Sequence, residues 1–222
     1  MLANSVLQTF HNGGPIMWPL LATLVLALMV ILDRTLWWFG HSSKLDAKAR
    51  DNARKLLGHG NFADAHQLGL SHRDIFLVTL TKGLENANTS LLAAMQLEAE
   101  HEIERAEARQ WVLSTVITLA PLLGLMGTVI GIMQSFDFVG DDTLAASKVS
   151  GGIAEALIAT ATGLGIAILC LLPYNYFRRR VQALRSHLER WINHSELLIQ
   201  SAGTHGHDVN AFAETVHPKP AE

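Results

Sequence analysis

The sequence has few of the residues on which many soluble enzymes and metal sites depend. It contains one cysteine, Cys170, which excludes an intrachain disulfide and a metal site built from several cysteines. Charged residues make up 17% of the chain, against about 25% in soluble domains, and the formal net charge of −3 gives no basic bias toward nucleic acid. It also lacks GxSxG, HExxH and phosphate-loop motifs, so we expect no enzyme, no cofactor and no bound metal.

Apolar residues are abundant instead, at 49% of the chain, and they gather in three long runs. A helix needs roughly 20 apolar residues to cross a bilayer. We therefore predict an all-α membrane protein with three transmembrane helices, at 15–36, 111–136 and 151–177. The second and third are expected to extend into long cytoplasmic helices.

The polar segments suggest further helices. Residues 37–110 are predicted to form a cytoplasmic helical region. Three short helices are expected within it, at 44–57, 62–70 and 72–85. From residue 88 onward, apolar residues recur every three or four positions without Gly or Pro, which predicts one helix that runs unbroken into the second span. After the third span we expect a cytoplasmic helix at 178–202 and a disordered tail at 203–222.

The distribution of Lys and Arg predicts the orientation in the membrane. Of 17 such residues, ten lie in 33–110, one in 137–150 and six after residue 177, with none before residue 33. Positively charged loops stay in the cytoplasm. We therefore expect a cytoplasmic C-terminus, a periplasmic N-terminus (1–14) and a periplasmic connection (137–150).

Small residues share one face of each of the last two predicted spans. At 100° per residue, these faces hold Ala120, Gly124, Gly127, Thr128, Gly131 and Ser135 in one span, and Gly152, Ala156, Ala159, Gly163 and Ala167 in the other. Small residues let membrane helices approach closely. The positions predicted to serve helix packing are Gly124, Gly127, Gly131, Gly152 and Gly163.

One carboxylate, Glu155, lies inside the third span, where a charge is costly and marks a functional site by default. It borders the small-residue face on one side, and Thr160 borders it on the other. Thr128 of the second span and Thr160 of the third lie at similar depths, each roughly 12–14 Å from the outer end of its span. The residues leave two roles open for Glu155: ion conduction, or a buried hydrogen-bonded residue that specifies assembly. A proton relay would need a second titratable group from another chain.

Long motifs in these spans resemble the MotA/TolQ/ExbB proton-channel family, most of all its ExbB branch. They are Ala120-Pro121, GLMGTVIGIMQSF at 124–136, GIAEALIATATGLGIAI at 152–168, and Tyr174-Asn175. The resemblance covers about 88–180 strongly and the first span more generally. It implies a homopentamer in the bacterial inner membrane, in contact with lipid, around the spans of a partner dimer that is ExbD-like or TolR-like.

The resemblance also implies roles for single residues. The family's functional glutamate and threonines match Glu155, Thr128 and Thr160, which would form a proton pathway with an aspartate of the partner. Proton flow would move the partner and, in ExbB-like systems, energise a TonB-like transducer and outer-membrane transport. Two alternatives stay open: a TolQ-like subunit of the Tol-Pal envelope system, and a membrane scaffold that conducts nothing. Thr162 stands where the family commonly has apolar residues, and we give it no role.

Overall fold

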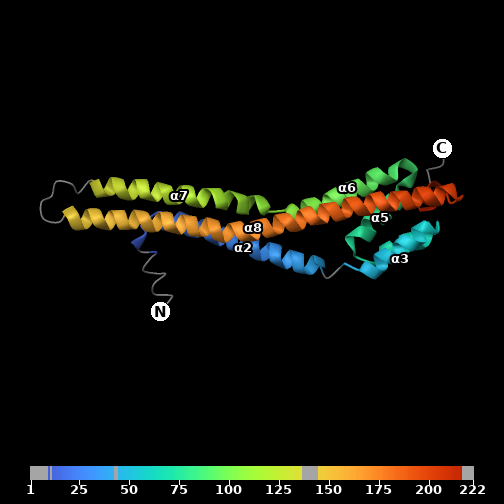
Figure 1. Ribbon diagram of the computed structural model, residues 1–222, viewed down its shortest axis with the longest axis horizontal. Coiled ribbons are helices and arrows are strands. Elements are labelled where there is room, and N and C mark those ends of the chain that lie inside the picture. The colour runs from blue at the N-terminus through green and yellow to red at the C-terminus, as the bar shows by residue number, and fades with distance from the viewer. Residues whose placement is uncertain (1–9, 11, 43–44, 137–144, 217–222) are drawn as a thin grey trace. The chain divides into compact units, whose positions relative to one another are not determined.

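The computed structural model describes residues 10, 12–42, 45–136 and 145–216, and its regular elements there are all α-helices (Figure 1). Three helical segments are long and apolar enough to cross a membrane: Met17–His41, Ala87–Phe136 and Val149–Thr204. The predicted all-α fold with three candidate membrane spans, of which the second and third are long, is therefore confirmed.

The chain divides into two compact units. The membrane unit comprises Met1–Thr35 and Arg109–Arg178, and the helical unit comprises Leu36–Ala108 and Arg179–Glu222. Two helices, α2 (Met17–Ser42) and α8 (Ala145–Thr204), contribute residues to both units.

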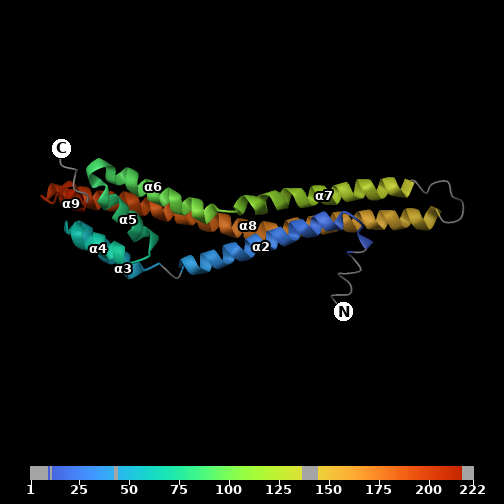
Figure 2. The ribbon, with the colours of Figure 1, turned by 180° about the vertical axis from the view of Figure 1, so that it is seen from behind.

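Over the described residues, the long helices of the membrane unit are α2, α7 (Gln110–Phe136) and the first part of α8. In this unit α7 lies along α8, and the view from behind shows α2 beside α8 as well (Figures 1 and 2). The buried side of α7 carries mainly small residues, whereas Leu122, Leu125 and Met133 are more than half exposed. Because so much apolar surface is unfavourable in water, this unit suits a bilayer or neighbouring subunits.

Helix α7 covers the predicted second span, 111–136, whereas α2 continues past residue 36 to Ser42 and α8 continues past residue 177 to Thr204. One difference concerns the start of α8, which begins at Ala145 rather than at residue 151. The expected connection 137–150 is therefore partly helical, and its residues 137–144 lie outside the described part of the chain.

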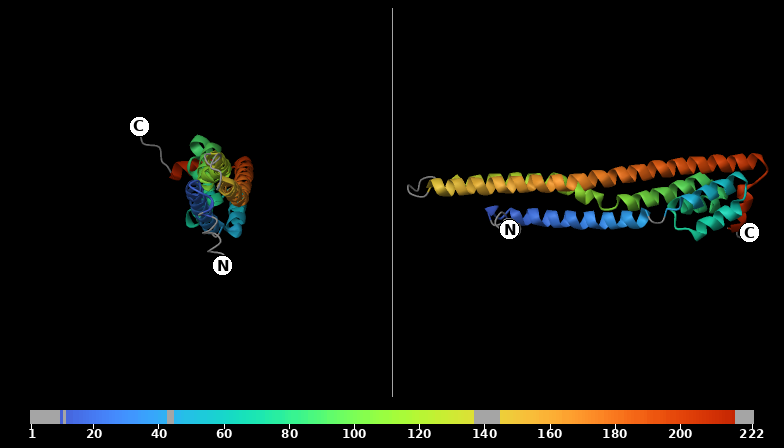
Figure 3. Two further views of the ribbon diagram at one scale, coloured as in Figure 1. Left: turned by 90° about the vertical axis from the view of Figure 1, so that its left-hand side faces the viewer. Right: turned by 60° about the horizontal axis from the view of Figure 1, so that its bottom comes forward.

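Short helices dominate the helical unit, and their residues explain where they start. The helices are α3 (Ala47–Gly58), α4 (Phe62–Ser71), α5 (Ile75–Glu85), α6 (Ala87–Glu107) and α9 (Val209–Val216), together with the end of α8. The side chains of Asp46, Asn61 and Asp74 accept hydrogen bonds from the first amides of α3, α4 and α5. Within this unit the short helices gather beside the C-terminal part of α8 (Figure 3).

The predicted continuous helix across residues 88–136 is wrong at two points. Ser90 has a non-helical φ of −166° and ψ of 102°, which kinks α6 near its start. A two-residue turn at Ala108 and Arg109 separates α6 from α7, and Arg109 has a φ of 64°. A positive φ is unfavourable for a residue with a side chain. Arg109 forms an ion pair with Asp33 of α2 at 2.6 Å, a contact distant in sequence that helix propensity does not reveal.

The predicted disordered tail is also wrong for part of its length. Val209–Val216 form α9, whose first turn is capped by Asp208 through a 2.8 Å bond from the amide of Asn210. In this helix Ala213 is fully buried, and the ring of Phe212 lies edge-on to that of His66, 5.6 Å away. Packing against the helical unit orders a segment whose composition suggests flexibility.

Candidate membrane site around Glu155

The glycines of α7 and α8 allow the two backbones to touch. A β-carbon built on Gly124 would lie 3.0 Å from the carbonyl oxygen of Ala159, and one on Gly131 would lie 3.0 Å from that of Gly152. A β-carbon on Gly163 would overlap the carbonyl oxygen of Ala120. No side chain fits at these positions without a shift of backbone, so α7 and α8 pack through their small residues.

A third helix joins this packing at Gly127. A β-carbon at Gly127 would lie 2.7 Å from the β-carbon of Ala159 and 2.8 Å from the Cγ2 atom of Ile16. Gly152 similarly leaves room for the hydroxyl of Ser135, which donates to the carbonyl of Gly131 at 2.8 Å. The small-residue faces therefore hold α7, α8 and the start of α2 together.

The three threonines of this region make different hydrogen bonds. The hydroxyl of Thr160 donates to the carbonyl oxygen of Gly124 on α7, at 2.9 Å. Thr128 donates to Leu125 at 2.6 Å and Thr162 to Ile158 at 2.8 Å, each within its own helix. Thr160 thus links two helices, whereas Thr128 and Thr162 bond to the turn that precedes them.

Glu155 is half-buried and lies against the turn that precedes α2. The nearest backbone is that of Gly14, where an added β-carbon would overlap the Oε1 atom of the Glu155 side chain. Gly14 has a φ of 69°, a conformation that glycine adopts without penalty. Its carbonyl accepts the amide of Met17 at 3.1 Å, which starts α2. Glycine at position 14 therefore allows the turn to form and leaves space for the carboxylate.

A cavity of about 250 Å³ adjoins the Glu155 side chain. It is lined by Gly13, Pro15, Ile16, Pro19, Gly127, Ile130, Gly131 and Glu155. Neither Thr128 nor Thr160 is among its lining residues. The structure thus brings Glu155 together with two predicted packing glycines and with the N-terminal turn, but not with the two threonines in one cavity.

The part of this site contributed by the N-terminal turn was missed by sequence reasoning. Residues 1–14 were expected to be only a polar periplasmic segment. The Gly13-Gly14-Pro15 sequence is the available signal, because two glycines before a proline indicate a tight turn. Nothing in the sequence shows which helix the turn would approach.

The chemistry available in this cavity is that of one carboxyl group in mainly apolar surroundings. Such a group can take up and release a proton. Across the described residues, no group of three His, Cys, Asp or Glu side chains is arranged to hold a metal ion.

Comparison with known proteins identifies the family. A model of the MotA/TolQ/ExbB proton channel family matches residues 71–190, more than half of the chain. The chain belongs to this family. The matched region contains all of α7 and the part of α8 that carries Glu155 and Thr160. Its three helices that are long and apolar enough to cross a membrane agree with a multi-pass member of this proton channel family.

Relatives from two branches of the family are similar to this chain. A protein of Synechocystis sp. named biopolymer transport protein ExbB-like 1 is 32% identical over 76% of this chain and 69% of its own length. ExbB-like 3 of the same organism is 35% identical over 75% of this chain and 81% of its own length. The Tol-Pal system protein TolQ of Haemophilus influenzae is 42% identical over 46% of this chain and 45% of its own length. The ExbB-like relatives match over the greater length.

Proposed function

We propose that this protein is the proton-channel subunit of an inner-membrane motor that couples the proton-motive force to TonB-dependent outer-membrane transport. The observation that carries the proposal is the placement of Glu155. It is the one carboxylate in residues 110–136 and 149–177, it is half-buried, and it adjoins a cavity between three helices. Ionisable residues at such positions commonly serve ion pathways.

The proposed mechanism needs a second chain. Glu155 takes up a proton and passes it to an aspartate of an ExbD-like single-span partner. A partner is needed because residues 110–136 and 149–177 carry no other carboxylate. Thr160 keeps α8 in register with α7, and Thr128 adds a hydroxyl at the matching depth of the pathway. In this proposal five copies surround the partner's spans, and the moving partner drives a TonB-like transducer.

The proposed orientation follows from the charges of the loops. Residues 33–110 and those after residue 177 carry 16 of the 17 Lys and Arg residues, which favours a cytoplasmic location for both. The N-terminus and the segment 137–150 then face the periplasm. Labelling of single cysteines placed in 137–150, from either side of the membrane, tests this orientation.

Proton flux in liposomes tests the channel itself. The protein and its ExbD-like partner are reconstituted together, and flux is followed with a pH-sensitive dye under an imposed potential. We expect Glu155→Gln to abolish flux while the complex still assembles. Glu104→Gln, on an exposed position of α6, is the matched control and should conduct normally. Wild-type flux from the Glu155 variant would contradict the proposal, and no flux from a correctly assembled wild-type complex would favour a scaffold.

A TolQ-like subunit of the Tol-Pal envelope system is the second candidate. The 42% identity to a TolQ protein over 103 residues supports it. The two candidates differ in the client that the motor serves. Deletion of the gene should cause iron starvation in the first case and leakage of the envelope in the second.

A further inference from the structure

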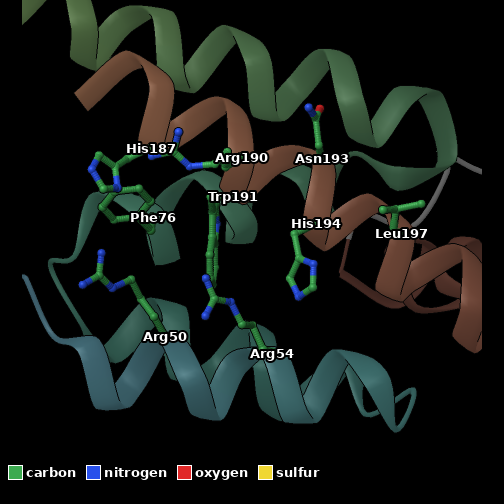
Figure 4. Close-up of a pocket in the computed structure, with 9 residues that line it drawn as sticks. All are labelled: Arg50, Arg54, Phe76, His187, Arg190, Trp191, Asn193, His194 and Leu197. Carbon is green, nitrogen blue, oxygen red and sulfur yellow. The ribbon is translucent and has the colours of Figure 1, made fainter. Parts of the chain in front are cut away.

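A cavity in the helical unit is built from arginines and aromatic rings, and the proposed proton channel does not use it. Its volume is about 570 Å³, within the range of small-molecule sites. Arg50 and Arg54 of α3, Phe76 of α5, and Arg190 and Trp191 of α8 line it. Figure 4 shows the two α3 arginines reaching toward α8 and Trp191 reaching back toward α3.

The lining supplies positive charge and no carboxylate. Besides the three arginines, its polar members are His187, Asn193 and His194. Arg190 has no carboxylate within ion-pair distance among the described residues. An arginine without a counter-ion beside two others repels them, so the cavity favours an anion that neutralises all three.

The acidic neighbours of Arg50 and Arg54 neutralise the charges of these two arginines only in part. Arg54 pairs with Asp51 at 3.0 Å. Both side chains are exposed to solvent, so the attraction between the two charges is weak. Arg50 lies 3.6 Å from the buried Asp74, whose carboxylate already accepts the amides of Asp46 and Phe76. Both guanidinium groups therefore retain the capacity to bind a ligand.

Aromatic rings hold two of these guanidinium groups in place. The guanidinium carbon of Arg50 lies 4.6 Å from the centre of the Phe76 ring, and that of Arg54 lies 5.2 Å from the centre of the Trp191 ring. The two rings contact each other edge-to-face, 6.0 Å apart. An arginine stacked by its face keeps its N–H groups free at the edge, where they can form paired bonds to phosphate oxygens.

We propose that this cavity binds a soluble phosphate-bearing anion. Three guanidinium groups match the oxygens of a phosphate or pyrophosphate, and the aromatic walls accommodate an attached organic group. A lipid headgroup fits less well because of distance along α8. The apolar part of α8 ends at Arg178–Arg180, and Arg190 lies ten residues further on, or about 15 Å of helix.

Calorimetry on the full chain tests the proposal. The protein is placed in nanodiscs of phosphatidylcholine and titrated with inorganic pyrophosphate at constant ionic strength. We expect saturable binding, and a Kd about tenfold higher for Arg190→Gln and for Arg54→Gln, because each loses charge-assisted hydrogen bonds. Arg190→Lys should recover part of the affinity. The matched control is Arg179→Gln, at an exposed position of α8 outside the cavity, which should bind normally.

Four results would overturn the proposal. The first is absence of saturable binding to the folded wild-type protein. The second is equal weakening by Arg179→Gln, which would indicate diffuse charge attraction. The third is a phosphatidylglycerol molecule that remains bound in native mass spectrometry and is lost in Arg190→Gln, without pyrophosphate binding, which would indicate a headgroup site. The fourth is a smaller oligomer for Arg190→Gln, which would assign the arginine to contact with a second copy of the chain.

Discussion

The hydroxyl of Thr160 and the carbonyl oxygen of Gly124 form a 2.9 Å hydrogen bond between α8 and α7. The bond crosses the helix pair where the backbones are close enough to touch, since a β-carbon on Gly124 would lie 3.0 Å from the α-carbon of Thr160. A threonine assigned to a proton pathway thus also has a structural role, and the two roles call for separate measurements.

Replacement of Thr160 by valine removes the hydroxyl and keeps the shape of the side chain. We expect a loss of about 1 kcal/mol in the stability of the helix pair, in the range measured for hydrogen bonds between membrane helices. Thr160→Ser should retain most of the bond. Thr162→Val is the control, because Thr162 bonds only to Ile158 of its own helix. Denaturation in detergent micelles measures stability, and liposome flux measures conduction; a stable variant without flux would separate the two roles.

Two glycines of α8 should respond to alanine in opposite ways. Gly163→Ala forces a β-carbon onto the carbonyl oxygen of Ala120 and should destabilise the unit by about 1–3 kcal/mol, as overpacking does. At Gly165 a β-carbon meets no described atom within 4 Å. Alanine there should be neutral or stabilise the helix by up to about 1 kcal/mol. The apparent melting temperatures of the Gly163→Ala and Gly165→Ala variants test this prediction. Equal losses of stability in both variants would show that Gly165 contacts another subunit.

Alanine at Gly14 should disturb Glu155 from a distance in sequence. The positive φ of 69° alone costs an alanine about 1 kcal/mol, and the new β-carbon displaces the Glu155 carboxylate. We expect proton flux well below that of the wild type, with α7 and α8 still packed. Gly151→Ala, whose β-carbon meets nothing within 4 Å, provides the control in the same unit. Normal flux from the Gly14 variant would separate the N-terminal turn from the pathway.

The helical unit should lose stability in acid through Glu85. Burial alone would raise the pKa of this carboxyl, but hydrogen bonds from Lys82 at 2.8 Å and His66 at 3.2 Å outweigh it and lower the pKa. A lowered folded-state pKa means that the stabilisation is complete above the unfolded pKa, about 4.3, and is lost as pH falls through the folded value. The bond to Glu85 raises the pKa of Lys82 in turn, so the stabilisation from this pair is also lost at strongly alkaline pH, where Lys82 loses its charge.

Melting curves between pH 3 and pH 7 test this dependence. Glu85→Gln should reduce the unfolding free energy at pH 7 by about 1 kcal/mol, because Lys82 is half exposed and its ion pair is weak. The wild type and the variant should converge as the pH falls through the lowered folded-state pKa of Glu85, because the carboxyl is then protonated in the folded protein as well. Glu104→Gln should leave the curve unchanged across the range. A difference that does not shrink as the pH falls would assign the effect to packing rather than to charge.

Local patterns in the sequence were sufficient to predict most of the helices. The structure places helices over the predicted ranges 44–57, 62–70 and 72–85 and over the three apolar runs, although α3 and α5 begin three residues later than predicted, after the capping residues Asp46 and Asp74. The small-residue faces likewise follow from a period of 3.6 residues, since the buried residues of α7 include Gly124, Gly127 and Gly131.

Features that depend on contacts distant in sequence were not predicted. The turn at Arg109 has no glycine or proline to announce it, and its partner Asp33 lies 76 positions earlier. The approach of Gly14 to Glu155 spans an even longer separation, 141 positions, and needs a particular rotation of α2. The arginine cavity was not predicted either, because its residues come from three helices and only their packing brings them together.

The helix α9 has a practical consequence for work with this protein. Its composition suggests a tail that could be removed to improve behaviour in solution. Removal after Thr204 would instead uncover the surface on which Ala213 is buried and would take Phe212 away from His66. The shortened protein would expose apolar side chains at the end of the helical unit and would aggregate more readily during purification.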